Sequence, residues 1–115
     1  DAYNAVAKAA GVNPEGTYVP QAYDAAFLLG LAIEKNGSAS REGLSAALRE
    51  VASPPGEKIL PGEWKKAVDL IKAGKDIDYE GAGGALDFDK AGDVDGIINY
   101  LVIKNGAFED MGPVQ

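Results

Sequence analysis

The residues with the clearest potential for metal chemistry lie in the segment that starts at Asp87. Acidic side chains occupy positions 1, 3, 7 and 9 of a calcium-binding loop counted from this residue, and Gly92 occupies position 6. The pattern fails at position 5, which is Ala91, and at position 12, where Ile98 replaces the bidentate glutamate. We therefore favour a turn whose aspartates cap their own backbone, with Gly92 at a positive φ, and keep a weak calcium site as the alternative.

A second stretch, Gly81-Ala82-Gly83-Gly84, has the glycine content of a phosphate-binding loop. Leu86 stands where a G-x-G-x-x-G motif needs its third glycine, and no Lys-Ser/Thr pair follows for a P-loop. The stretch therefore indicates a flexible turn that enters a strand, or a place where two backbones approach closely.

Catalytic chemistry is restricted further, because the chain has no histidine and no cysteine. Ser-His-Asp triads, imidazole bases, histidine-bound metals and thiol nucleophiles are excluded. The 18 acidic residues leave room for a glycosidase-like carboxylate pair, but solvation of the surface explains most of them. We expect a protein that is not an enzyme, that uses no cofactor and that holds no resident metal.

Two tyrosines, Tyr18 and Tyr23, flank the start of a predicted helix. Such rings either pack in a core or form the wall of a ligand cleft, and packing is the favoured interpretation for both. Trp64 lies on a regular helical stripe and is also expected to pack against other side chains.

The elements that must position these residues are mainly helices in the first part of the chain. Apolar residues at i, i+3, i+4 and i+7 from Tyr3 to Ala10, followed by Gly11, predict a short first helix. The segment 20–35 is apolar nearly all round and predicts a helix that is buried on several sides. Its thin polar strip consists of Gln21, Asp24 and Glu34.

Two further helices and a set of strands are predicted after that helix. Ser40 is predicted to cap a surface helix whose apolar stripe is Leu44, Ala47, Leu48 and Val51, and another helix is predicted from about Pro61 to Ala73. The apolar period then changes toward two, which indicates strands separated by turns. Asn105-Gly106 is the pair that a type I′ hairpin turn prefers, so a hairpin is expected near the end of the chain.

Composition narrows the possible partners. The 11 basic and 18 acidic residues give a net charge of −7, so nucleic acid is a poor partner. No apolar run approaches the roughly eighteen residues that a membrane-spanning helix needs.

The chain starts at Asp1, which fits a processed or cut product. The apolar helix over 20–35 needs cover from another copy or from residues outside the chain, so self-association is expected.

Two blocks together resemble the periplasmic solute-binding proteins of branched-chain amino-acid transporters. The first block runs from Tyr18 to Gly37 and contains Gln21-Ala22-Tyr23-Asp24-Ala25, which is similar to the family's "QAYDA" helix. The second runs from Tyr79 to Val94 and is similar to the family's glycine-rich strand and F-D-x-x-G-D turn. The resemblance covers nearly all of the chain. The chain itself corresponds only to roughly the last third of the family's usual length.

The resemblance implies an α/β fold, the carboxy-terminal segment of a type I periplasmic-binding-protein-like fold with helices followed by β-hairpins. It places residues 1–17 in a second-lobe helix and hinge, 18–78 in a helical segment of the first lobe, and 79–115 in a hinge strand and terminal hairpins. It implies a periplasmic protein that closes on a small amino-acid-like solute and delivers it to the membrane permease subunits of an ABC importer. By this resemblance, Tyr23 is the first residue expected to contact the ligand, and Gln21 is the second.

Two points stay open at this stage. The segment 54–78 is longer than the corresponding link in the shorter members of that family, and the solute could instead be an amide, urea or an aromatic acid. The alternative from another class is a self-associating interaction module, in which the helix over 20–35 forms a homodimer core and no small ligand is bound.

Overall fold

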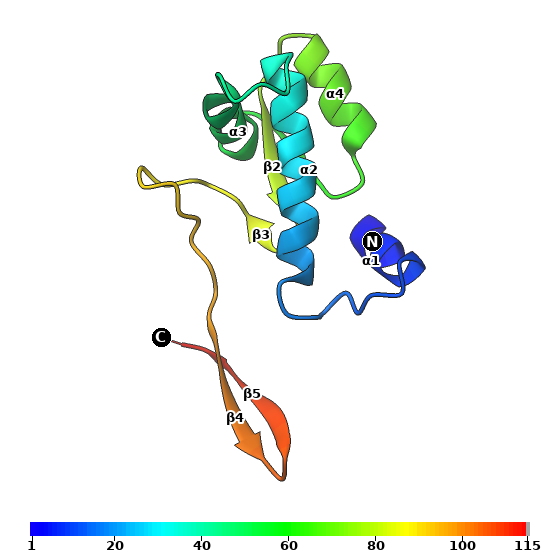
Figure 1. Cartoon of the computed structure of the whole chain (residues 1–115), viewed down its shortest axis with the longest axis vertical. Helices are drawn as coiled ribbons and strands as arrows, with labels where there is room; N and C mark the ends of the chain where they lie inside the picture. Colours follow the sequence, from blue (N-terminus) through cyan, green and yellow to red (C-terminus); the bar gives the residue numbers. More distant parts are fainter. Residues whose placement is uncertain (115) are drawn as a thin grey trace.

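Helix α2, Val19–Asn36, is the element around which the others pack (Figure 1). The structure is a computed structural model that describes residues 1–114. Pro20 lies in the first turn of α2, and Gly37 ends the helix with φ 69°, as the sequence predicts. Burial is confined to one face of the helix, so the prediction of burial on several sides is wrong for this chain. The uncovered apolar face consists of Ala22, Ala25, Ala26 and Leu29.

Helix α1, Ala2–Ala9, confirms the short first helix. Asp1 caps it, because its side chain accepts a hydrogen bond from the Asn4 backbone N–H at 2.8 Å. The phenol of Tyr3 donates to the carbonyl oxygen of Pro14 at 2.6 Å, and this bond ties the helix to the turn that follows it. Both bonds fix the first turn of α1.

Helix α3, Leu44–Ala52, begins later than the sequence indicates. Its N-cap is Gly43 with φ 77°, so the prediction that Ser40 caps this helix is wrong. The physical reason is Asn36, whose side-chain amide donates to the carbonyl oxygens of Ser38 and Glu42, both at 3.0 Å. These bonds hold residues 38–42 as a loop and delay the first helical turn.

The segment 54–78 forms a β-α-β unit that the sequence analysis did not anticipate. Strand β1, Glu57–Ile59, pairs in parallel with β2, Ile77–Gly81, and helix α4, Trp64–Lys72, connects them. A Cβ on Gly56 would lie 2.4 Å from the carbonyl carbon of Ile77, so only glycine lets the two strands meet at this end.

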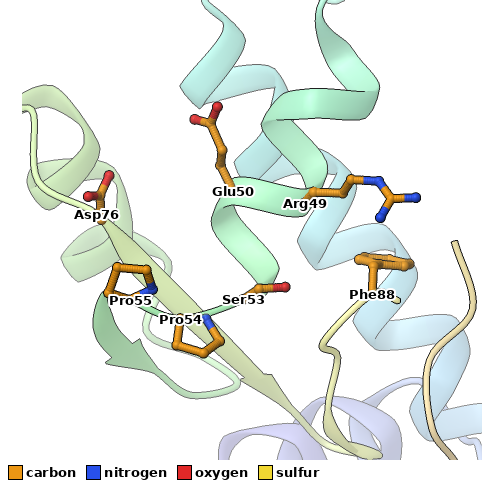
Figure 2. Close-up of a pocket in the computed structure, with 7 residues that line it drawn as sticks. All are labelled: Arg49, Glu50, Ser53, Pro54, Pro55, Asp76 and Phe88. Atoms are coloured by element: carbon orange, nitrogen blue, oxygen red, sulfur yellow. The ribbon is translucent and has the colours of Figure 1, made fainter. Parts of the chain in front are cut away.

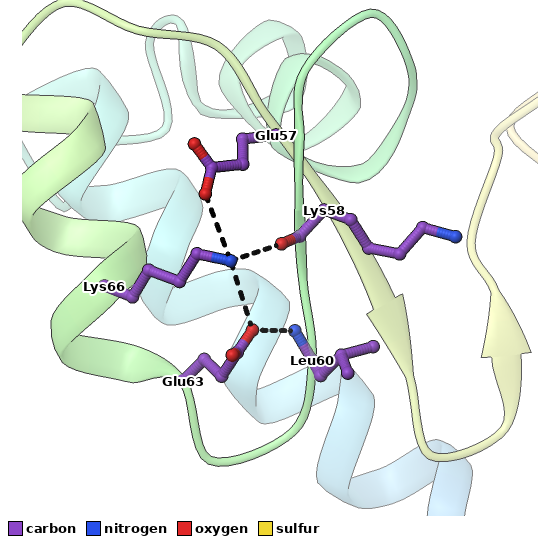
Figure 3. Close-up of polar contacts among 5 residues, drawn as sticks. All are labelled: Glu57, Lys58, Leu60, Glu63 and Lys66. Carbon is purple, nitrogen blue, oxygen red and sulfur yellow. Dashed lines mark hydrogen bonds and ion pairs between the residues drawn. The ribbon is translucent and has the colours of Figure 1, made fainter.

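Helix α4 starts at Trp64 rather than at Pro61, because the residues before it form a turn (Figure 3). The Glu63 carboxylate accepts the Leu60 backbone N–H at 2.8 Å. The Lys66 ammonium lies 3.2 Å from the Glu57 carboxylate, 3.7 Å from that of Glu63, and 2.9 Å from the Lys58 carbonyl oxygen. This exposed network joins the start of α4 to β1.

The hydrophobic core lies where α2, α3 and α4 meet the β1–β2 pair. Gly30 of α2 makes room for the indole of Trp64, since a Cβ there would lie 2.8 Å from the ring. The indole meets Phe27 edge-on at 5.5 Å, which confirms the predicted packing of Trp64. The fully buried members of the core are Leu31, Ala32, Ala52, Ile59, Ala67 and Tyr79.

The rest of the chain is extended. Strand β3, Gly84–Ala85, pairs antiparallel to β2, and β4, Asn99–Lys104, forms a hairpin with β5, Ala107–Pro113. Asn105 and Gly106 have φ of 51° and 77°, which confirms the predicted turn. The hairpin projects away from the body (Figure 1), and its apolar side chains are exposed.

The mixed α/β class predicted from the sequence is confirmed. The assignment of residues 1–17, 18–78 and 79–115 to two lobes and a hinge stays a prediction. Among residues 1–114, no helix combines the length and the apolar character needed to cross a bilayer.

Candidate functional site

Two hollows lie at the amino-terminal end of α2, and we refer to them as the Gln21 hollows. The larger one has a volume of about 610 Å³ and lies between residues 15–21 and residues 97–99. The smaller one, about 410 Å³, lies between α2, residues 83–86 and residues 94–97. Gln21 and Ile97 line both of them. Volumes of this order match those of small-molecule sites.

Tyr18 stands on the wall of the larger hollow and is 77% exposed. Its backbone is left-handed, with φ 62° and ψ 3°, a conformation that costs a bulky residue about 1–3 kcal/mol. The predicted packing of Tyr18 in a core is therefore wrong, and the alternative of a cleft wall is the one that the structure supports. Strain of this kind concentrates at ligand-binding positions.

Gln21 lies in the first turn of α2 and is exposed to both hollows. Its side-chain nitrogen lies against Gly83, since a Cβ on that glycine would be 3.6 Å from it. An amide offers both donors and an acceptor, so Gln21 can bind either polar end of a small solute. Its predicted ligand contact agrees with this placement and stays a prediction.

Tyr23 is placed differently, because it is not among the side chains that line the Gln21 hollows. Its ring meets Tyr3 edge-on at 5.3 Å and stacks on Phe27 at 5.9 Å. Phe27 in turn stacks on Tyr79 at 4.7 Å. The ring of Tyr23 thus joins α1 to α2, and the predicted ligand contact of Tyr23 remains without support from geometry.

Asp24 belongs to the polar strip of α2, yet it is only 1% exposed. Its carboxylate accepts the Tyr79 phenol at 2.9 Å and the backbone N–H groups of Ala82 and Gly83, both at 2.7 Å. Both of its oxygens therefore have hydrogen-bond partners, as a buried charge requires. Its spacing of four and seven residues from Leu28 and Leu31, which are also buried, is the sequence pattern that could have revealed it.

The glycine-rich stretch that starts at Gly81 therefore surrounds the carboxylate of Asp24. A Cβ on Gly81 would lie 2.3 Å from Cγ and Oδ2 of Asp24. Such an approach is open to glycine alone. The interpretation as a turn that enters a strand is confirmed, because β3 begins at Gly84, and the alternative of two approaching backbones is wrong, because the nearest group to Gly81 is the Asp24 side chain.

Burial raises the pKa of Tyr79 well above its ordinary value, and the hydrogen bond to the Asp24 carboxylate raises it further. The phenol is fully buried, so it stays protonated under conditions that would ionise an exposed tyrosine. The hydrogen bond to Asp24 therefore persists to a higher pH than the bond of an exposed phenol would.

Alkaline unfolding tests this buried phenol. Because its pKa is raised in the folded state, its stabilisation is fully present below the ordinary value of 10.0 and is lost as the pH rises above it. The loss is at most about 1.4 kcal/mol per pH unit. In urea titrations from about pH 9 to about pH 11, the wild type should lose stability relative to Tyr79→Phe. A constant difference over this range would contradict the raised pKa.

The segment around Asp89 forms the self-capped turn favoured above. Its carboxylate accepts the backbone N–H groups of Gly92 at 2.8 Å and Asp93 at 2.9 Å, and Gly92 has φ 96°. These backbone hydrogen bonds, with Asp93 first, hold the pKa of Asp89 below its ordinary value. In the part of the chain that the structure describes, no group of three or more acidic side chains is arranged to hold a metal ion.

Another hollow, of about 490 Å³, lies between the end of α3 and Phe88 (Figure 2). The Arg49 guanidinium lies 5.9 Å from the centre of the Phe88 ring, while Glu50 and Asp76 point elsewhere (Figure 2). Both carboxylates are paired with Lys35, at 3.6 and 3.4 Å. Because its charged groups do not converge, we give this hollow less weight than the Gln21 hollows.

Comparison with known proteins supports the resemblance at a coarse level. The chain is 32% identical over 112 residues to the chemotactic signal transduction system substrate-binding protein BasB of Halobacterium salinarum (strain ATCC 29341 / DSM 671 / R1). The match covers 86% of this chain and 27% of that protein, so the chain spans about a quarter of its relative's length. No family model and no solved structure matches the chain. The similarity and the mixed α/β structure agree with a segment of a periplasmic-binding-protein-like fold.

Proposed function

We propose that this chain is part of a periplasmic substrate-binding protein that captures a small amino-acid-like solute at the Gln21 hollows. The observation that carries the proposal is the exposed ring of Tyr18, held on a strained backbone, beside the exposed side chain of Gln21, in a chain similar to a substrate-binding protein. The proposed role is binding without chemical conversion.

The lining of the hollows favours a solute with both an apolar and a polar part. Tyr18, Ile97 and Ile98 offer apolar surface, and Gln21 offers hydrogen bonds. A branched-chain amino acid has this division between its side chain and its charged groups. Closure of a second lobe over the hollows would supply the contacts to those charged groups, and the closed form would then dock on the permease subunits of an ABC importer.

A second destination for the bound form is a signalling receptor, because the relative belongs by its name to a chemotactic signal transduction system. Capture of the solute would be the same in both cases, and only the docking partner would differ. The self-associating module without a ligand is the competing proposal, supported by the uncovered face of α2 and the exposed hairpin.

Calorimetry on the full-length protein that contains this chain separates these proposals. We expect saturable binding of one or more of L-leucine, L-isoleucine and L-valine, with a monomer seen by light scattering. A dimer that binds none of these and none of a panel of amides and aromatic acids would favour the interaction module.

The variant Tyr18→Asn tests whether the strained backbone of Tyr18 serves solute binding. Asparagine tolerates the left-handed region better than tyrosine, so the free energy of unfolding should rise by up to about 1 kcal/mol. Solute affinity should nevertheless fall at least about tenfold, because the apolar wall is lost. Chemical denaturation and calorimetry measure the two effects. Equal affinity of the variant and the wild type would remove Tyr18 from the site.

A further inference from the structure

The Asp24 carboxylate joins two parts of the smaller hollow that are far apart in the sequence. It lies one turn after Gln21 on α2, and it bonds the backbone of the turn that follows β2. The two backbone bonds use different oxygens: Oδ1 accepts from Ala82 and Oδ2 accepts from Gly83. The carboxylate therefore fixes both the position and the tilt of this turn against α2.

Gln21 rests on the same turn. A Cβ on Gly83 would lie 3.2 Å from Oδ2 of Asp24, 3.6 Å from the side-chain nitrogen of Gln21 and 3.7 Å from its Cγ. The surface under the Gln21 side chain is thus the Gly83 backbone, and the position of that backbone is set by Asp24. Any displacement of the turn changes the floor on which the Gln21 amide lies.

We propose that Asp24 is a positioning residue of the solute site: by holding the Ala82–Gly83 backbone, it fixes the orientation in which Gln21 presents its amide to the solute. This inference rests on the proposed function for the identity of the site, but its structural part can be tested without any ligand. Asp24 lines the smaller hollow, but it is only 1% exposed and both of its oxygens accept hydrogen bonds from the chain, so in this scheme it acts through the turn and not on the solute.

Asp24→Asn and Tyr79→Phe form a matched pair of variants. Asparagine keeps the shape but has one acceptor oxygen, so one of the two backbone N–H groups faces an NH₂ donor. Tyr79→Phe removes the phenol donor to Oδ1 and leaves both backbone bonds in place. Both variants should lower stability, since each leaves part of a buried network unsatisfied. Only the first should disturb the turn and Gln21.

The measurements are amide hydrogen exchange at Ala82 and Gly83, the NMR signals of the Gln21 side-chain amide, and calorimetric affinity for L-leucine, L-isoleucine and L-valine, all on the full-length protein. For Asp24→Asn we expect exchange at Gly83 or Ala82 to be faster by about tenfold or more, shifted Gln21 signals, and affinity lower by about tenfold. For Tyr79→Phe we expect an affinity within about twofold of that of the wild type. The Gln21 signals of this variant should match those of the wild type within experimental noise.

Unchanged exchange and unchanged Gln21 signals in Asp24→Asn would overturn the inference, and so would identical effects of the two variants. Should the wild type bind none of the three amino acids, the proposed ligand class fails, while exchange and the Gln21 signals still decide the role of Asp24. If Asp24→Asn does not fold, Gly83→Ala replaces it: the added methyl would lie 3.2 Å from Oδ2 of Asp24 but only in ordinary contact with Gln21, so it separates the carboxylate from the turn, and the same shift of the Gln21 signals is expected.

Discussion

Replacing Gly81 by alanine should lower the free energy of unfolding by about 3 kcal/mol, because overpacking adds to the loss of buried hydrogen bonds. The added Cβ would lie 2.3 Å from Cγ of Asp24. The carboxylate has no free direction in which to move, since Tyr79 holds it on one side and the Ala82–Gly83 backbone on the other. Urea unfolding monitored by circular dichroism measures the loss.

Gly96→Ala is the matched control for that variant. A Cβ on Gly96 meets nothing within 4 Å, and its φ lies outside the left-handed region. Its substitution should change the free energy of unfolding by less than about 0.5 kcal/mol. Equal losses at the two positions would mean that the glycine at 81 serves chain flexibility rather than the close approach to Asp24.

Leu31→Ala should cost about 3 kcal/mol, within the range measured for leucines truncated in protein cores. Leu31 is fully buried in the cluster between α2, α3 and the β1–β2 pair. Leu29, two residues earlier on the same helix, is 43% exposed and should cost less than about 1 kcal/mol when truncated. The comparison is made on this chain of 115 residues by urea unfolding. A loss at Leu29 as large as that at Leu31 would show that the outer face of α2 is covered in solution.

The elements best predicted from the sequence are those whose ends are set by local chemistry. Pro20 and Gly37 bound α2 through restrictions on their own backbones, and Asn105-Gly106 sets the hairpin turn in the same way. None of these depends on a residue that is distant in the sequence. For the same reason the self-capped turn at Asp89 could be anticipated, since its partners lie within four residues.

The features that were missed depend on distant partners. Asp24 is buried because Tyr79 and Gly83, which lie 55 and 59 residues away in the sequence, donate hydrogen bonds to it. A charged residue with no partner nearby in the sequence is normally predicted to lie at the surface. Strand β1 has three residues and exists only by pairing with β2. The strained backbone of Tyr18 likewise has no local signature, because tyrosine rarely adopts the left-handed region. The candidate site was therefore predicted only in part, through Gln21.

The long sequence separation within the Asp24 cluster has a consequence for synthesis on the ribosome. Asp24 leaves the ribosome well before Gly83, which lies 59 residues later. At roughly 5–20 residues per second, about 3 to 12 seconds pass before the last donor to the carboxylate has been made. During that interval a hydrated charge lies within the stripe of α2 that will later be buried, beside Leu28. The residue that completes the core of the folded protein thus also limits premature association of the nascent helix.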